Sequence, residues 1–94
     1  MHDYKPEIIY IIRKNLKNNP ADILLFGSRA DGKASNVSDF DIAIRSETEI
    51  YDSVMDAIRE ELENSNIPFK IDLVDYNKVS DKLRQSIDRS SIKW

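Results

Sequence analysis

The sequence predicts a small α/β (α+β) domain: a mixed β-sheet of three to four strands with helices packed on one face. Two observations support this class. Short apolar or alternating segments, at 23–26, 40–45 and 69–74, are separated by longer segments whose apolar residues recur at helical spacing. The 94 residues suffice for one hydrophobic core and not for two, so we expect a single domain over 1–94.

Three helices are predicted, at residues 6–18, 46–64 and 78–89. In each, the apolar residues lie on one side of the helix and the charged residues on the other, which is typical of a helix packed on a core. For the second helix, Ser46 and Glu49 have the spacing of a capping box, in which each side chain satisfies a backbone N–H of the first turn.

Strands are predicted at 22–27, 40–45 and 69–74, with a short edge strand at 92–94. The first two are joined by a loop with no crossover helix, so we expect them to be antiparallel. A long helix joins the second to the third, which allows a parallel pair. The end of the first strand then lies beside the start of the second.

Polar residues at this junction form the main candidate site. Gly27 lets the backbone approach a ligand closely, and Ser28 with the N–H groups that follow can form an anion-binding turn. Asp39 and Asp41 are two residues apart, so on a strand both carboxylates leave the same face. Asp72 faces away from the core on the third strand, and the predicted topology brings it to the same place.

Clustered carboxylates indicate a metal-dependent site. Three of them within about 5 Å of one another repel by roughly 3 kcal/mol per pair at an effective dielectric constant near 20. That is a large part of the roughly 5–10 kcal/mol that stabilises a small domain. A divalent cation removes the repulsion, and oxygen ligands without His or Cys favour Mg²⁺ or Mn²⁺. The residues therefore predict phosphoryl or nucleotidyl transfer from a metal-bound nucleoside triphosphate.

Composition excludes several other classes. The net charge is −3 and the Lys and Arg residues are scattered, which argues against duplex nucleic acid as a partner. There is no cysteine, so disulfides, thiol catalysis and zinc–thiolate sites are excluded. No apolar segment approaches membrane-spanning length and the first residues lack a signal-peptide pattern, so we expect a cytoplasmic protein that does not bind membranes.

The ordered motif also carries a family resemblance. The chain resembles the DNA polymerase β-type nucleotidyltransferase superfamily in the segments Gly27-Ser28-Arg29-Ala30-x-Gly32 and Ser38-Asp39-x-Asp41-Ile42. Together with the strand that bears Asp72, it is similar over nearly its whole length to the smallest branch, the minimal nucleotidyltransferase (MNT) domains. Asp31 stands where many relatives carry a basic residue, which argues against an additional cationic clamp there.

The resemblance implies roles for individual residues. Asp39, Asp41 and Asp72 would be the catalytic residues, and the same three would hold the metal, with two Mg²⁺ ions (or Mn²⁺) expected and ATP as substrate. The expected nucleotide-binding residues are Gly27, Ser28, Arg29 and Ser38. For Arg29 and Lys33, a phosphate contact and a solvated loop charge remain alternatives.

The resemblance to MNT domains also implies a biological role. Members of this branch resemble antitoxins that pair with a HEPN-domain RNase toxin, and the resemblance implies transfer of AMP from ATP to a tyrosine hydroxyl of that toxin. A hetero-oligomer is then expected. One alternative is a non-catalytic nucleotide-binding module that neutralises or scaffolds a partner protein by contact. Another is transfer to a small molecule or an RNA end.

Overall fold

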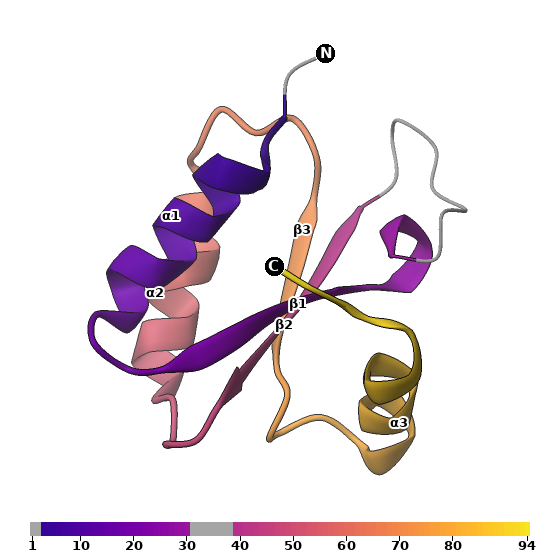
Figure 1. The fold of residues 1–94 in the computed structure, drawn as a ribbon. Coiled ribbons are helices and arrows are strands. Elements are labelled where there is room, and N and C mark those ends of the chain that lie inside the picture. The colour runs from indigo at the N-terminus through magenta and orange to yellow at the C-terminus, as the bar shows by residue number, and fades with distance from the viewer. Residues whose placement is uncertain (1–2, 31–38) are drawn as a thin grey trace.

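The computed structural model describes residues 3–30 and 39–94, which form a sheet with helices on both of its faces (Figure 1). Its elements, in chain order, are α1 (Lys5–Leu16), β1 (Ala21–Phe26), the 3-10 turn η1 (Gly27–Arg29), β2 (Phe40–Ser46), α2 (Asp52–Glu63), β3 (Ile71–Asp75), α3 (Asp81–Ser90) and β4 (Ile92–Lys93).

The sheet is mixed and has the order β3-β2-β1-β4. β1 pairs with β2 in antiparallel orientation, and β2 pairs with β3 in parallel orientation. Both orientations agree with the sequence prediction. The predicted edge strand is confirmed as β4, which pairs with β1, and the Trp94 N–H extends this pairing by donating to the Ile23 carbonyl oxygen at 2.8 Å.

The main core lies between one face of the sheet and the pair α1–α2. Its fully buried residues are mostly isoleucines, whose branched side chains favour strands and are restricted to one preferred rotamer in a helix. They are Ile8 and Ile12 from α1, Ile58 from α2, and Ile23, Ile42 and Ile44 from the sheet.

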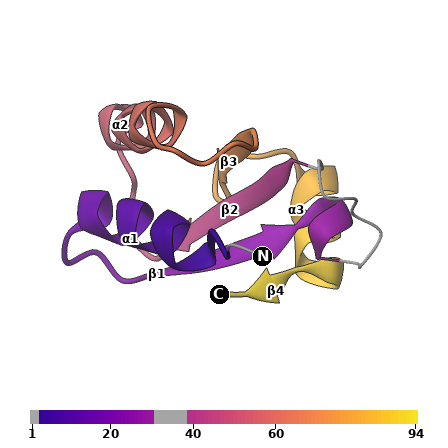
Figure 2. The ribbon, with the colours of Figure 1, turned by 90° about the horizontal axis from the view of Figure 1, so that it is seen from above.

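A smaller core on the opposite face corrects the expectation that all helices pack on one face. Ile87 of α3 is fully buried there against Leu24, Phe26 and Ala43. Figures 1 and 2 show α3 well apart from the α1–α2 pair. The cause is the uninterrupted apolar run of β1, because alternate residues of a strand face opposite sides and this run is apolar on both.

The start of α2 also differs from the prediction, and the Ser46–Glu49 capping box is wrong. Ser46 is the last residue of β2, and its hydroxyl accepts from the Thr48 N–H at 3.2 Å. The helix begins at Asp52 without a side-chain cap. A side-chain cap is present at α3, where the Ser80 hydroxyl accepts from the Leu83 N–H at 3.2 Å.

No helix within residues 3–30 and 39–94 combines the length and apolar character that crossing a membrane requires.

Candidate active site

Strand register brings the predicted acidic residues to one end of the sheet. Asp41, the second residue of β2, is paired across the sheet with Phe26 on one side and with Asp72 of β3 on the other. Neighbouring strands are about 4.8 Å apart, so Asp41 and Asp72 are adjacent positions on the same face. Asp39 immediately precedes β2. The end of β1 and the starts of β2 and β3 therefore meet, as the sequence predicted.

Gly27 is in direct contact with one of these carboxylates. Its φ of 75° lies in the left-handed region that favours glycine. A Cβ placed on Gly27 would overlap Asp41 Oδ2 and would lie only 3.2 Å from Asp41 Cγ. Any other residue would thus push the Asp41 side chain away. The Gly-Ser turn and the Asp-x-Asp motif are consequently two parts of a single site.

The charges at this site influence one another. Asp41 is partly buried, whereas Asp39 and Asp72 are exposed. Burial raises the pKa of Asp41, the negative charges of Asp72 and then Asp39 raise it further, and Lys70 opposes them. Sequence reasoning assigned no role to Lys70. The sequence feature that could have indicated a role is the position of Lys70, two residues before Asp72 and immediately before β3.

The acidic residues of the site suit a divalent metal ion. In the part of the chain that the structure describes, no three His, Cys, Asp or Glu side chains are gathered into a ready ligand group. Mg²⁺, however, is usually held by one or two carboxylates, with substrate phosphates and water completing its shell. Two adjacent aspartates with a third beside them, all oxygen donors, fit that requirement.

The structure describes the positions of some of the remaining predicted binding residues but not of others. Ser28 lies within η1, partly buried, in a turn closed by the Ala30 N–H donating to the Gly27 carbonyl oxygen at 3.1 Å. The Arg29 guanidinium stacks on the ring of Phe40, with 3.9 Å from Cζ to the ring centroid. Sequence reasoning missed this contact, since nothing in the local pattern of either segment indicates it. Ser38 and Lys33 lie outside the described residues.

A glycine turn held against a row of strand-borne aspartates is the arrangement that defines nucleotidyltransferases of the polymerase β type. The chain belongs to the polymerase beta nucleotidyltransferase family, whose model matches residues 7–93. The family and enzyme class expected from the motif are thereby confirmed.

Individual relatives place the chain near the MNT branch. It is 36% identical over 76 residues to the "Probable protein adenylyltransferase MntA" of Haemophilus influenzae, an alignment covering 79% of this chain and 67% of the relative. A solved toxin–antitoxin structure with AMP-PNP superposes with a TM-score of 0.78 at 27% identity, covering 96% of this chain and 72% of that one.

Two further solved structures are also similar to this chain. The complex of a tri-AMPylated Shewanella oneidensis HEPN toxin with its MNT antitoxin gives a TM-score of 0.72 at 25% identity, with 96% of this chain and 68% of that one covered. A spectinomycin adenyltransferase from Enterococcus faecialis gives a TM-score of 0.63 at 16% identity, covering 98% of this chain and 48% of that one, and shares the fold alone. The resemblance to MNT domains is confirmed.

Proposed function

We propose that this nucleotidyltransferase is a protein adenylyltransferase that acts as an antitoxin. It moves AMP from ATP to a hydroxyl, that of a tyrosine, on a partner HEPN-domain toxin and releases pyrophosphate, and it forms a hetero-oligomer with that toxin. The observation that carries the proposal is the contact between Gly27 and Asp41, with Asp72 at the paired position of the next strand. The relatives described as adenylyltransferase, antitoxin and AMPylated complex support the choice of acceptor.

Each site residue then has a role in binding or proton transfer. Gly27 and Ser28 bind the terminal phosphates of ATP through backbone N–H groups and the Ser28 hydroxyl. Asp39, Asp41 and Asp72 would hold Mg²⁺, two ions by family resemblance, with Mn²⁺ as a substitute. When bound, the metal neutralises the triphosphate and lowers the pKa of the acceptor hydroxyl. Asp72 orients that hydroxyl and takes up its proton.

The position of Asp72 supports an acceptor that belongs to another protein. β3 is an edge strand and Asp72 is exposed on it, so a side chain of a partner can approach it from outside the sheet. Gly27 and Ser28 lie on the other side of Asp41, toward β1. Nucleotide and acceptor would therefore enter from opposite sides of Asp41, which leaves room for a large acceptor.

The test is the intact mass of the HEPN-domain partner after co-expression with this protein. We expect a gain of one or more AMP units with the parent chain and none with Asp41→Asn. The control is Asp56→Asn, which changes an acid 74% exposed on α2 and should leave the modification intact.

Other outcomes would refute the proposal in defined ways. An unmodified partner that co-purifies with both the parent and Asp41→Asn would indicate the non-catalytic binding module. A partner that is neither modified nor bound would place the acceptor elsewhere. In that case, loss of transfer after nuclease treatment of the acceptor fraction would identify an RNA end.

A further inference from the structure

Four aromatic side chains form a cluster directly behind the candidate site. The aromatic cluster consists of Tyr4, Phe40, Phe69 and Trp94, which come from four separate segments of the chain. Phe69 contacts Tyr4 and Phe40 with ring centroids 5.7 and 5.8 Å apart, and Phe40 contacts Trp94 at 6.2 Å. All three contacts are edge-to-face, the arrangement that aromatic quadrupoles favour.

Arg29 connects the Gly-Ser turn to this cluster. Its guanidinium carbon lies 3.9 Å from the ring centroid of Phe40 and 4.9 Å from that of Phe69. Both distances are within the roughly 6 Å range of a cation–π contact. Phe40 is buried and Arg29 is partly buried, so the contact is partly shielded from water.

The two rings belong to the segments that bear the acids. Phe40 stands between Asp39 and Asp41, and Phe69 lies three residues before Asp72. The two segments are also joined through the backbone, because the Phe40 N–H donates to the Lys70 carbonyl oxygen at 3.0 Å. One guanidinium thus touches both acid-bearing segments and is itself part of the glycine turn.

The Arg29 guanidinium stacks on the face of the sheet opposite the one that carries Asp41. Successive residues of a strand face opposite sides, so the Phe40 ring lies on the side opposite Asp41. Phe40 packs into the main core with α1 and α2, whereas Ala43, on the Asp41 side, packs into the smaller core with α3. Arg29 therefore reaches past the N-terminal end of β2 to the face that carries no catalytic carboxylate.

From this geometry we infer that Arg29 is a positioning residue for nucleotide binding. It acts through Phe40 and Phe69, holding Gly27 and Ser28 against Asp41, and not by contacting the phosphates of the nucleotide. The inference rests on the proposed role of the Gly-Ser turn in binding ATP. It makes the aromatic cluster the support that fixes the turn relative to the strands bearing Asp41 and Asp72.

The test is a double-mutant cycle read out as the dissociation constant of ATP in the presence of Mg²⁺. The variants are Arg29→Met, which keeps the aliphatic stem without the charge, Phe69→Leu, and the two combined. Calorimetric titration is performed at a temperature where melting curves show every variant folded. If Phe69→Leu does not fold, Phe69→Met replaces it.

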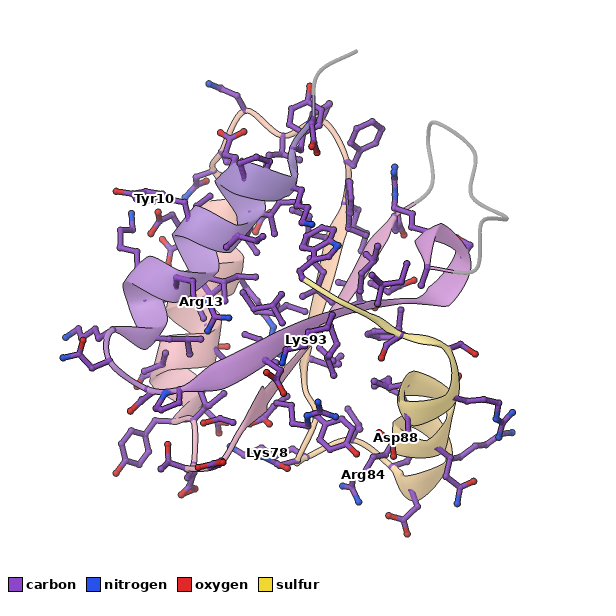
Figure 3. All side chains as sticks on the ribbon, in the orientation of Figure 1. Tyr10, Arg13, Lys78, Arg84, Asp88 and Lys93 are labelled. Atoms are coloured by element: carbon purple, nitrogen blue, oxygen red, sulfur yellow. The ribbon has the colours of Figure 1, made fainter. Side chains whose placement is uncertain are left out.

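We expect Arg29→Met to bind ATP about tenfold more weakly, the scale of a partly shielded cation–π contact, and Phe69→Leu to bind it more weakly by a smaller factor because the closer contact with Phe40 remains. The combined variant should bind no more weakly than Arg29→Met alone, because the contact that Phe69→Leu removes is one that Arg29→Met removes as well. Arg29→Lys retains a cation above the rings and should restore most of the affinity. The matched control is Arg84→Met on α3, since Arg84 also lies over an aromatic ring, Tyr76 at 5.6 Å, but away from the site (Figure 3).

Distinct results would overturn the inference. If the losses caused by Arg29→Met and by the Phe69 variant add in the combined variant, Arg29 acts on ATP independently of the ring and contacts the phosphates directly. If both variants melt at lower temperature but bind ATP as the parent does, the contact is purely structural. If the proposed function itself is wrong, the parent will not bind ATP, or Asp41→Asn will bind ATP as tightly as the parent does.

Discussion

Replacing Asp41 by Asn should change the stability of the protein in opposite directions with and without nucleotide. Asp41 is partly buried and lies beside Asp72, with Asp39 two residues away. In the absence of metal, three negative charges in this space oppose folding. The Asn variant removes one of them and keeps the shape and size of the side chain.

The magnitude follows from the strand spacing. Two unit charges about 4.8 Å apart repel by roughly 3.5 kcal/mol at an effective dielectric constant of 20 and by roughly 0.9 kcal/mol in water. Since Asp39 and Asp72 are exposed, the lower value applies, and we expect the metal-free variant to gain about 1 kcal/mol. For a domain of this size that raises the melting temperature by roughly 4–8 °C.

Bound nucleotide should reverse which of the two proteins, the parent or Asp41→Asn, melts at the higher temperature. A ligand at a concentration 100 times its dissociation constant adds about 2.7 kcal/mol to the stability of a protein that binds it only when folded. The parent should gain this amount with saturating ATP and Mg²⁺, whereas Asp41→Asn, lacking a metal ligand, should gain little. The parent would then melt above the variant.

Scanning calorimetry in EDTA and in Mg²⁺-ATP measures both effects, with Asp56→Asn as the control for loss of an exposed acid. A variant that melts well below the parent in EDTA would show that Asp41 is a structural residue. A variant that gains as much stability from Mg²⁺-ATP as the parent would show that the carboxylate does not take part in nucleotide binding.

Three further predictions test the surroundings of the site. Gly27→Ala should lower the free energy of unfolding by about 1–2 kcal/mol because of its positive φ, and should abolish ATP binding; unchanged urea unfolding curves would contradict the geometry. Hydrogen bonds from Arg45, at 2.8 Å, and from Lys93 lower the pKa of Asp22, so this stabilisation is complete above the ordinary pKa of about 3.9 and is lost as pH falls through the lowered one. Asp22→Asn should therefore lose less melting temperature between pH 7 and pH 2 than the parent, and equal losses would refute the role of the pair. Ile87→Ala should cost about 2–5 kcal/mol in chemical denaturation, because Ile87 of α3 is fully buried against the sheet, and a cost under about 1 kcal/mol would mean that α3 is only loosely packed.

The sequence was sufficient to predict how the site is assembled, because connection rules determine it. The sequence predicts a loop between the first two strands and a helix between the second and third, and the antiparallel and parallel pairings follow from these connections. Alternation along each strand then decides which face carries Asp41 and Asp72. None of these steps requires knowledge of distant contacts.

Features that depend on tertiary packing were not predictable in the same way. Helical periodicity shows that α3 has an apolar face but not which side of the sheet that face covers. The Ser46–Glu49 spacing fits a cap wherever a helix starts, and only the length of β2 shows that Ser46 still belongs to the strand. Arg29 lies far from Phe69 in sequence, so their contact exists only once the sheet has formed.

The start of β2 shows how stability and function select the same register. Asp39, Phe40 and Asp41 present carboxylates to one face of the sheet and an aromatic ring to the other. A slip of one residue would bury the charge of Asp41 in the isoleucine-rich core and turn the Phe40 ring toward the site. An isolated buried carboxylate costs several kcal/mol, a large part of the stability of a small domain. The core therefore enforces the alignment that the site requires, and the aromatic cluster with Arg29 extends that alignment to the glycine turn.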